Sequence, residues 1–209
     1  MGKKNDMEQR SYTFEVRASE NNMISGNPIV YDSPTDIGGW FREIISKGAL
    51  DGADLRDVPF LVNHNDRMIP VARSRRNNAN STMRLIVTDR GLDIEADLDV
   101  ENNDTSRALY SAVSRGDISG MSFMFRVKDE RWENLDSDYP TRYIDKFEAI
   151  GEVSAVTFPA YDATSINARS KEALDNARSA VESARQQSEQ SVDTDLELLK
   201  LQFRFKEEM

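Results

Sequence analysis

Cysteine is absent from this chain of 209 residues. Disulfide bonds, thiol nucleophiles and thiolate metal sites are therefore excluded. A domain of about 150–170 residues still buries roughly two-thirds of the surface of its unfolded chain. A normal hydrophobic core is thus available without covalent cross-links.

Histidine is almost as scarce, since His64 is the only one in the chain. Any imidazole chemistry must use this residue. A zinc enzyme of the usual kind needs two or three imidazole or thiolate ligands, and this chain can supply one. We therefore expect no metal site and no cofactor, because metal catalysis would have to depend on carboxylates alone.

Long apolar runs are missing as well. No segment approaches the roughly 18 apolar residues that span a bilayer. The basic residues Lys3 and Lys4 are not followed by a hydrophobic stretch. We expect neither a signal peptide nor a membrane partner.

Positive charge is in deficit, with a formal net charge of −10 and a pI of about 4.7. Phosphate backbones repel such a chain, so nucleic acid is not an expected partner. The one basic cluster, residues 73–76, runs into the asparagine-rich segment 77–81. This composition predicts a solvated hairpin loop rather than a phosphate site.

Alternating apolar and polar residues dominate the first three-quarters of the chain, and this pattern predicts strands. Residues 1–10 are polar and are expected to be frayed. The predicted strands cover residues 12–16, 26–31, 40–45, 58–63, 83–87, 91–98, 118–127, 142–147 and 149–157.

One helix is predicted from Asp104 to a stop at Gly116, with Leu109 and Val113 on its apolar face. Strands that outnumber helices in this way indicate an α+β fold. We expect a mostly antiparallel β-barrel, closed or nearly closed, with a few helices.

The composition changes after Arg169. Residues 171–190 are rich in Ala, Glu, Arg, Gln and Ser, and Ala177, Val181 and Ala184 share one stripe. A capping-box pattern at 194–197 precedes further apolar residues. We therefore divide the chain into a flexible N-terminus (1–10), a main domain (11–169) and a helical tail (170–209) that docks weakly or pairs with another chain.

Three residues could carry hydrolytic chemistry. Ser122 alternates with Met121 and Phe123, so its side chain faces away from theirs. His64 lies where an apolar strand runs into polar residues. Glu152 is a carboxylate in an apolar strand, which is costly to bury unless something pairs with it.

Each residue also has a structural interpretation. A lone histidine at a strand end often only forms hydrogen bonds, and a serine among large apolar side chains is usually inert. A serine mechanism needs a nucleophile, an imidazole base and a group that orients the imidazole. The residues alone make this mechanism possible for His64 but do not choose Ser122 over Ser119 or Ser154.

Together, several segments resemble the prohead protease family of tailed phages. Their order and spacing across residues 11–169 carry the resemblance. The matching segments are 39–45 (GWFREII), 47–50 (KGAL), 61–66 (LVNHND), 89–92 (DRGL), 114–123 (SRGDISGMSF) and 151–161 (GEVSAVTFPAY).

The resemblance implies a fold similar to that of the herpesvirus assemblins, a β-barrel surrounded by helices. It also implies that His64 is the base and Ser122 the nucleophile of a serine endopeptidase. Assemblins use a second histidine, which this chain lacks. The resemblance therefore places a carboxylate, Glu152, in the third role.

The same resemblance implies an enzyme packaged inside the immature capsid, or prohead, in the host cytoplasm. Its expected partners are the major capsid protein and its scaffolding region. We expect it to cleave that region and also itself, near residues 165–190, with possible self-association.

Two other functions remain open. The chain could be a catalytically silent scaffold or capsid-assembly protein with the same fold, although the presence of both His64 and Ser122 argues against this. It could also be a general acyl hydrolase, but Met124 stands where the nucleophile elbow of those enzymes has a glycine.

Overall fold

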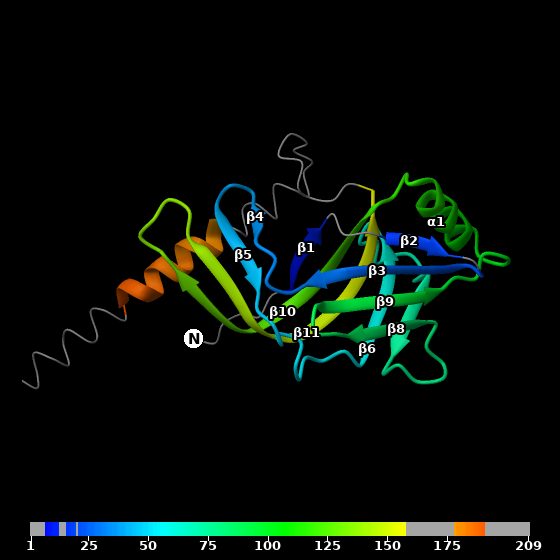
Figure 1. Cartoon of the computed structure of the whole chain (residues 1–209), viewed down its shortest axis with the longest axis horizontal. Coiled ribbons are helices and arrows are strands. Elements are labelled where there is room, and N and C mark those ends of the chain that lie inside the picture. Colours follow the sequence, from blue (N-terminus) through cyan, green and yellow to red (C-terminus); the bar gives the residue numbers. More distant parts are fainter. Residues whose placement is uncertain (1–6, 13–15, 20, 158–177, 191–209) are drawn as a thin grey trace, which may run out of the picture.

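Two β-sheets make up most of the chain in the computed structural model, which describes residues 7–12, 16–19, 21–157 and 178–190 (Figure 1). The first sheet contains β1 (Glu8–Tyr12), β4 (Thr35–Ile37), β5 (Phe41–Ile45), β6 (Asp57–Val62), β7 (Ala72–Arg75), β10 (Gly120–Glu133) and β11 (Thr141–Val156). The second sheet contains β2 (Val16–Ser19), β3 (Met23–Val30), β8 (Met83–Val87) and β9 (Gly91–Asp97). The predicted α+β class with mostly antiparallel strands is confirmed.

A long antiparallel hairpin of β10 and β11 organises the first sheet. β1 pairs with the free edge of β10. The free edge of β11 is shared by two short parallel strands, β5 along Thr141–Ile144 and β6 along Val153–Ala155. The segments predicted as two strands, 142–147 and 149–157, are therefore one continuous strand.

The predicted closed barrel is wrong. Within the described residues, no ladder of paired strands joins the two sheets. β5 and β6 occupy different stretches of one edge of β11, so the first sheet forks into two branches. The sheets approach each other at β7 and β8, where the backbone N–H of Thr82 donates to the carbonyl of Arg73 at 3.0 Å.

The main hydrophobic core lies between the two sheets. Met121, Phe123 and Phe125 of β10 are completely or almost completely buried there, together with Phe147 of β11. The three phenylalanine rings contact one another, with centroids 5.0–6.2 Å apart. Their alternation along β10 follows the period of two that the sequence predicts.

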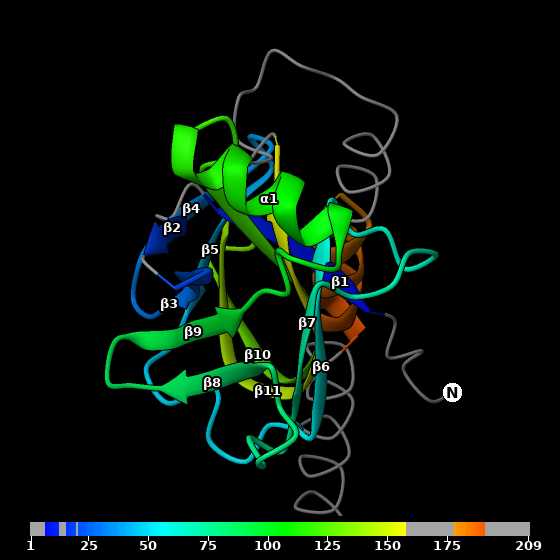
Figure 2. The same ribbon diagram turned by 90° about the vertical axis from the view of Figure 1, so that its right-hand side faces the viewer.

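The predicted helix is α1 (Asp104–Arg115), which lies across one end of the two sheets (Figure 2). Asn103 caps its N-terminus by accepting hydrogen bonds from the backbone N–H groups of Thr105 and Ser106. Gly116 ends it in the left-handed conformation at φ 79°. None of the described helices is long and apolar enough to cross a bilayer.

Two stretches that were expected to lack regular structure are strands. Glu8–Tyr12 forms β1, although residues 1–10 were expected to be frayed. Ala72–Arg75 forms β7 against β6, so the predicted loop begins only after Arg75. Both strands consist mostly of polar residues without an apolar alternation, and pairing with a neighbouring strand stabilises them instead.

A network of ion pairs holds β1 in place. Arg142 contacts Glu8 at 2.6 Å, Glu43 at 3.0 Å and Glu130, while Arg10 contacts Glu43 at 2.6 Å. The side chain of Glu43 is fully buried and that of Arg142 is 3% exposed. Although burial alone would raise the pKa of the Glu8 carboxyl, hydrogen bonding and charge from Arg142, with the charge of Arg10, lower it to about 2 from 4.5.

The described part of the tail, residues 178–190, is helical as predicted. It lies beside the outer part of the β10–β11 hairpin (Figure 1, orange). Val181 is 4% exposed and packs with Ile37 and Phe41 in a second, smaller apolar cluster. Arg185 donates to the carbonyl of Leu135 at 2.9 Å. The remainder of the predicted tail helices lies outside the described residues.

Replacing Arg142 tests the ion-pair network. Arg142→Met should lower the free energy of unfolding at neutral pH by about 3–5 kcal/mol, because it leaves buried carboxylates without their main partner. In the native chain the contribution of Glu8 is fully present above pH 4.5 and is lost as the pH falls towards 2. Urea denaturation at a series of pH values measures both effects.

The matched control is Arg115→Met. Arg115 pairs with Asp117 at 2.6 Å but is 63% exposed. Removing an exposed pair should cost no more than about 1 kcal/mol. Equal effects of the two substitutions would contradict a stabilising role for the buried network.

Candidate active site

The outer face of the β10–β11 ladder carries polar residues, in contrast to its core face. Ser122 is the ladder partner of Ser154, and Glu152 lies two residues from Ser154 on the same strand. Opposed residues of a ladder, and residues two apart on one strand, point to the same side. Because Met121 and Phe123 point into the core, Ser122, Ser154 and Glu152 share the opposite face.

His64 reaches this face from the end of β6. The strand pairs in parallel with the last part of β11, and the N–H of Asn63 donates to the carbonyl of Ala155 at 2.9 Å. Asn63 and His64 then both adopt left-handed backbone conformations, at φ 52° and 56°. This reversal turns the imidazole towards Glu152.

Asn63 fixes the turn through its side chain. Its Nδ2 donates to Oγ1 of Thr157 at 3.1 Å, and its Oδ1 accepts from the Thr157 N–H at 3.0 Å. Asparagine tolerates the left-handed region better than most residues, while a second such residue in succession is unusual. These side-chain bonds attach the end of β6 to the end of β11 and hold His64 beside it.

A buried carboxylate engages the imidazole. Oε1 of Glu152 contacts Nδ1 of His64 within hydrogen-bond distance, and the Glu152 side chain is 7% exposed. A carboxylate oxygen is the acceptor here, so Nδ1 carries the proton and Nε2 has its lone pair available. Within the described part of the chain, Nε2 is buried and has no hydrogen-bond partner.

Ser154 connects the two members of this pair. Its Oγ donates to Oε2 of Glu152 at 2.8 Å and accepts from the backbone N–H of His64 at 3.2 Å. The residue is completely buried. One hydroxyl therefore fixes both the carboxylate rotamer and the backbone of the imidazole residue.

The Ser122 hydroxyl donates to the carbonyl of Arg10 on β1 at 2.7 Å, and the residue is completely buried. Ladder partners have Cα atoms about 4.5–5.5 Å apart, so Ser122 lies one strand away from Ser154, and the backbone of His64 lies beyond Ser154 at the end of β6. A rotation about its Cα–Cβ bond changes the partner of the hydroxyl without moving the strand.

Of the three residues that the sequence singled out, the structure brings His64 and Glu152 into contact and places Ser122 on the neighbouring strand, opposite Ser154. Of the two alternative nucleophiles, Ser119 is exposed just before β10, whereas Ser154 is buried and bonded to both Glu152 and His64. Asp66, a carboxylate two residues after His64, is exposed. Asp162, another carboxylate in the matched C-terminal region, lies outside the described residues.

Sequence reasoning considered Ser154 only as a possible nucleophile and assigned no role to Asn63. The only available signals were that Ser154 stands two residues from Glu152, which places both on one face of a strand, and that an asparagine follows the apolar run of β6. Neither signal identifies a hydrogen-bond partner. Among the described residues, no group of three or more His, Asp or Glu side chains could hold a metal ion.

A comparison with protein families finds one model that matches residues 11–178, and its description is caudovirus prohead serine protease. The match includes His64, Ser122, Glu152 and Ser154, and it extends past Arg169 to the first described residue of the tail helix. No curated protein and no solved structure matches the chain.

The single histidine makes the His64–Glu152 contact directly observable. In protein labelled with ¹⁵N-histidine, the Nδ1 proton should give one strongly downfield signal, because it is bound to a buried carboxylate. Glu152→Gln should move this signal upfield, since the acceptor loses its charge. Ser154→Ala should broaden it, since the carboxylate loses the hydroxyl that fixes its rotamer.

Ser119→Ala is the control, because Ser119 is exposed and should leave the spectrum unchanged. A proton signal on Nε2 rather than Nδ1 in the native protein would contradict the assigned tautomer.

Proposed function

The chain belongs to the caudovirus prohead serine protease family, a family of capsid-maturation peptidases, and on this basis we propose that Ser122, His64 and Glu152 form its catalytic triad. The observation that carries the proposal is the buried contact of Glu152 with Nδ1 of the only histidine. This contact sets the tautomer that a general base needs, because it leaves Nε2 as the proton acceptor.

In the proposed reaction, Nε2 of His64 takes the proton from Oγ of Ser122 as that oxygen attacks the peptide carbonyl. Glu152 stabilises the imidazolium that forms. The carbon–nitrogen bond then breaks, and the proton passes from Nε2 to the departing amine. Water, deprotonated by the same imidazole, attacks the acyl-enzyme ester and releases Ser122 with its proton restored.

The Ser122 hydroxyl must leave the Arg10 carbonyl to enter this cycle. The ladder between β10 and β11 keeps the serine backbone in place during the rotation. Ser154 and Asn63 act as positioning residues in this proposal, since the first fixes Glu152 and the second fixes the turn that carries His64.

The substrate that we propose is the scaffolding region of the major capsid protein, together with the chain itself. Membership of the family places the protease in the immature capsid in the host cell. A cut near residues 165–190 would separate the main domain from the tail.

The two open sheets of this chain do not form the barrel of the assemblins.

We propose recruitment as the role of the tail. Residues 170–209 are mainly polar and alanine-rich until Leu196, and an amphipathic segment of this kind can pair with scaffold helices. Enclosing many copies in one shell raises the effective concentration of such a weak interaction.

The second candidate is a silent assembly protein with the same fold. The left-handed backbone of Asn63 and His64 and the buried carboxylate of Glu152 favour the enzyme. Each of these features costs of order 1–3 kcal/mol or more of stability and contributes nothing to an assembly surface.

Ser122→Ala and His64→Ala should each abolish proteolysis, because the nucleophile and base act as a unit. Co-expression of either variant with the co-encoded capsid protein should give shells that contain only uncleaved subunits, as judged by gel electrophoresis. Circular dichroism should show an unchanged fold.

Two further variants complete this series. Ser119→Ala should process the capsid protein normally, and Glu152→Gln should lower the rate by about 10²–10⁴. Normal processing by Ser122→Ala would refute the nucleophile assignment. An unchanged rate in Glu152→Gln would transfer the orienting role to another carboxylate, such as Asp66 or Asp162.

A chain that ends at Arg169 should still react with a fluorophosphonate serine probe, because the triad and the main core lie before this point. Its free energy of unfolding should be lower by about 2–3 kcal/mol, since Val181 no longer packs on Ile37 and Phe41. It should also be depleted from proheads.

Val181→Ala in the full-length chain separates these effects. This variant should lose part of the stability but should still enter proheads normally. A truncated chain that is inert towards the probe would show that the tail is part of the folded enzyme.

A further inference from the structure

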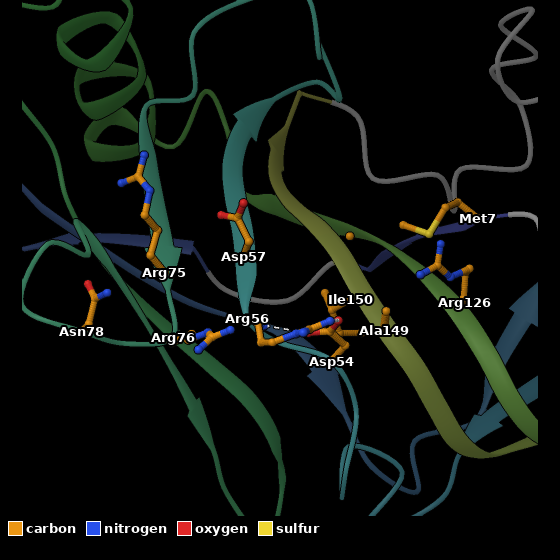
Figure 3. Close-up of a pocket in the computed structure, with 11 residues that line it drawn as sticks. Met7, Asp54, Arg56, Asp57, Arg75, Arg76, Asn78, Arg126, Ala149 and Ile150 are labelled. Atoms are coloured by element: carbon orange, nitrogen blue, oxygen red, sulfur yellow. Dashed lines mark hydrogen bonds and ion pairs between the residues drawn. The ribbon is translucent and has the colours of Figure 1, made fainter.

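An open pocket of about 740 Å³ lies beside the candidate triad, and its rim is rich in arginine (Figure 3). Gly151, which is next to Glu152 in the chain, forms part of its wall. Its charged lining residues are Arg56, Arg75, Arg76, Arg126, Asp54 and Asp57. Four arginines against two aspartates leave a local positive excess in a chain whose net charge is −10.

Both aspartates already have partners. Asp54 accepts from Nε of Arg56 at 2.8 Å, and Asp57 accepts from Nε of Arg73 at 2.7 Å. Hydrogen bonding from Arg73, with the charges of Arg73 and Arg75, outweighs the effect of burial and lowers the pKa of Asp57.

Two guanidinium groups remain available for a ligand. The side chains of Arg75 and Arg76 are exposed, and within the described part of the chain neither makes a hydrogen bond or an ion pair. The backbone N–H of Arg76 donates to the carbonyl of Arg56 at 2.9 Å, which keeps these two arginines of the rim adjacent. Like charges held together in this way favour an anionic ligand.

The pocket and Ser122 lie on the same face of the first sheet. Arg75 is the ladder partner of Asp57 on β6. Leu61 lies four residues after Asp57 on the same strand, and its ladder partner is Ser154. Ser154 is opposite Ser122. Since paired residues and every second residue of a strand share a face, Arg75 points to the side that carries Ser122.

The separation suits an extended peptide. Arg126 lines the pocket and lies four residues from Ser122 on β10, which corresponds to roughly 13 Å along a strand. A peptide in an extended conformation has the same rise per residue. Arg75 lies further from Ser122 than Arg126 does, because β11 and β6 separate β10 from β7 and Asp57 lies four residues from Leu61 along β6. An acidic side chain several residues from the bond at Ser122 would therefore reach it.

We propose that Arg75 and Arg76 form a specificity subsite that binds an acidic side chain of the peptide substrate, several residues from the bond that is cleaved. The inference rests on the proposed protease function and adds the substrate chemistry. A guanidinium group binds a carboxylate by two parallel hydrogen bonds and by opposite charge. The amide of glutamine has a similar shape but no charge.

Internally quenched peptide libraries test this subsite, with one position at a time fixed as Glu or Gln and the cleaved bond located by mass spectrometry. For the native chain, Glu should raise kcat/KM about tenfold over Gln at one position, several residues from the cleaved bond. The double variant Arg75→Gln/Arg76→Gln should lose this preference. Its rate on the Gln peptides and its labelling by a fluorophosphonate probe should stay unchanged.

Arg84→Gln is the matched control, since Arg84 is an exposed arginine on β8 of the other sheet and should keep the preference. A native enzyme without a Glu preference, or a double variant that retains it, overturns the subsite. Weaker binding of duplex DNA by the double variant, with peptide cleavage unaffected, would instead assign the pocket to a polyanion and also overturn it. If the native chain neither cleaves peptides nor reacts with the probe, the proposed function itself fails and the subsite fails with it.

Discussion

The antiparallel ladder between β10 and β11 is the interaction on which the rest of this structure depends. Its alternation sends Met121 and Phe123 into the core and leaves Ser122, Ser154 and Glu152 on the other face. The apolar half of the ladder supplies the stability that permits buried polar groups on the opposite side. The register of this ladder therefore sets both the packing of the core and the geometry of the site. A slip of one residue would move the core side chains to the site face and the site side chains to the core face.

A second and weaker interaction, the parallel pairing of β6 with β11, places the imidazole on this face. β6 contacts β11 over only three residues, and the two left-handed residues that follow are costly. Hydrogen bonds from Asn63 to Thr157 and from Ser154 to Glu152 offset this cost and limit the freedom of His64. The most strained backbone of the site thus lies where the proposed general base needs a single orientation.

The N-terminal strand connects the site to a distant set of charges. The ion pairs of Arg142 and Arg10 hold β1 against β10, and β1 provides the carbonyl that accepts from Ser122. The environment of the serine hydroxyl therefore depends on buried charges near the turn of the hairpin, where Arg142 is the ladder partner of Trp132. The pocket lined by Arg75 and Arg76 lies on the same face, so the proposed catalytic and recognition elements share one side of the sheet.

The sequence by itself determined the α+β class, the helix from Asp104 to its stop at Gly116, and the opposite orientations of Ser122 and Phe123, because these follow from local propensity and from periods of 3.6 and 2. A single histidine also limited the base to His64. Tertiary structure alone decided that the sheets stay open, since strand pairing across long separations leaves no local pattern. It also decided that β1 is ordered and that Ser154 joins His64 to Glu152, because an ion pair or hydrogen bond between distant residues depends on how the chain folds back on itself.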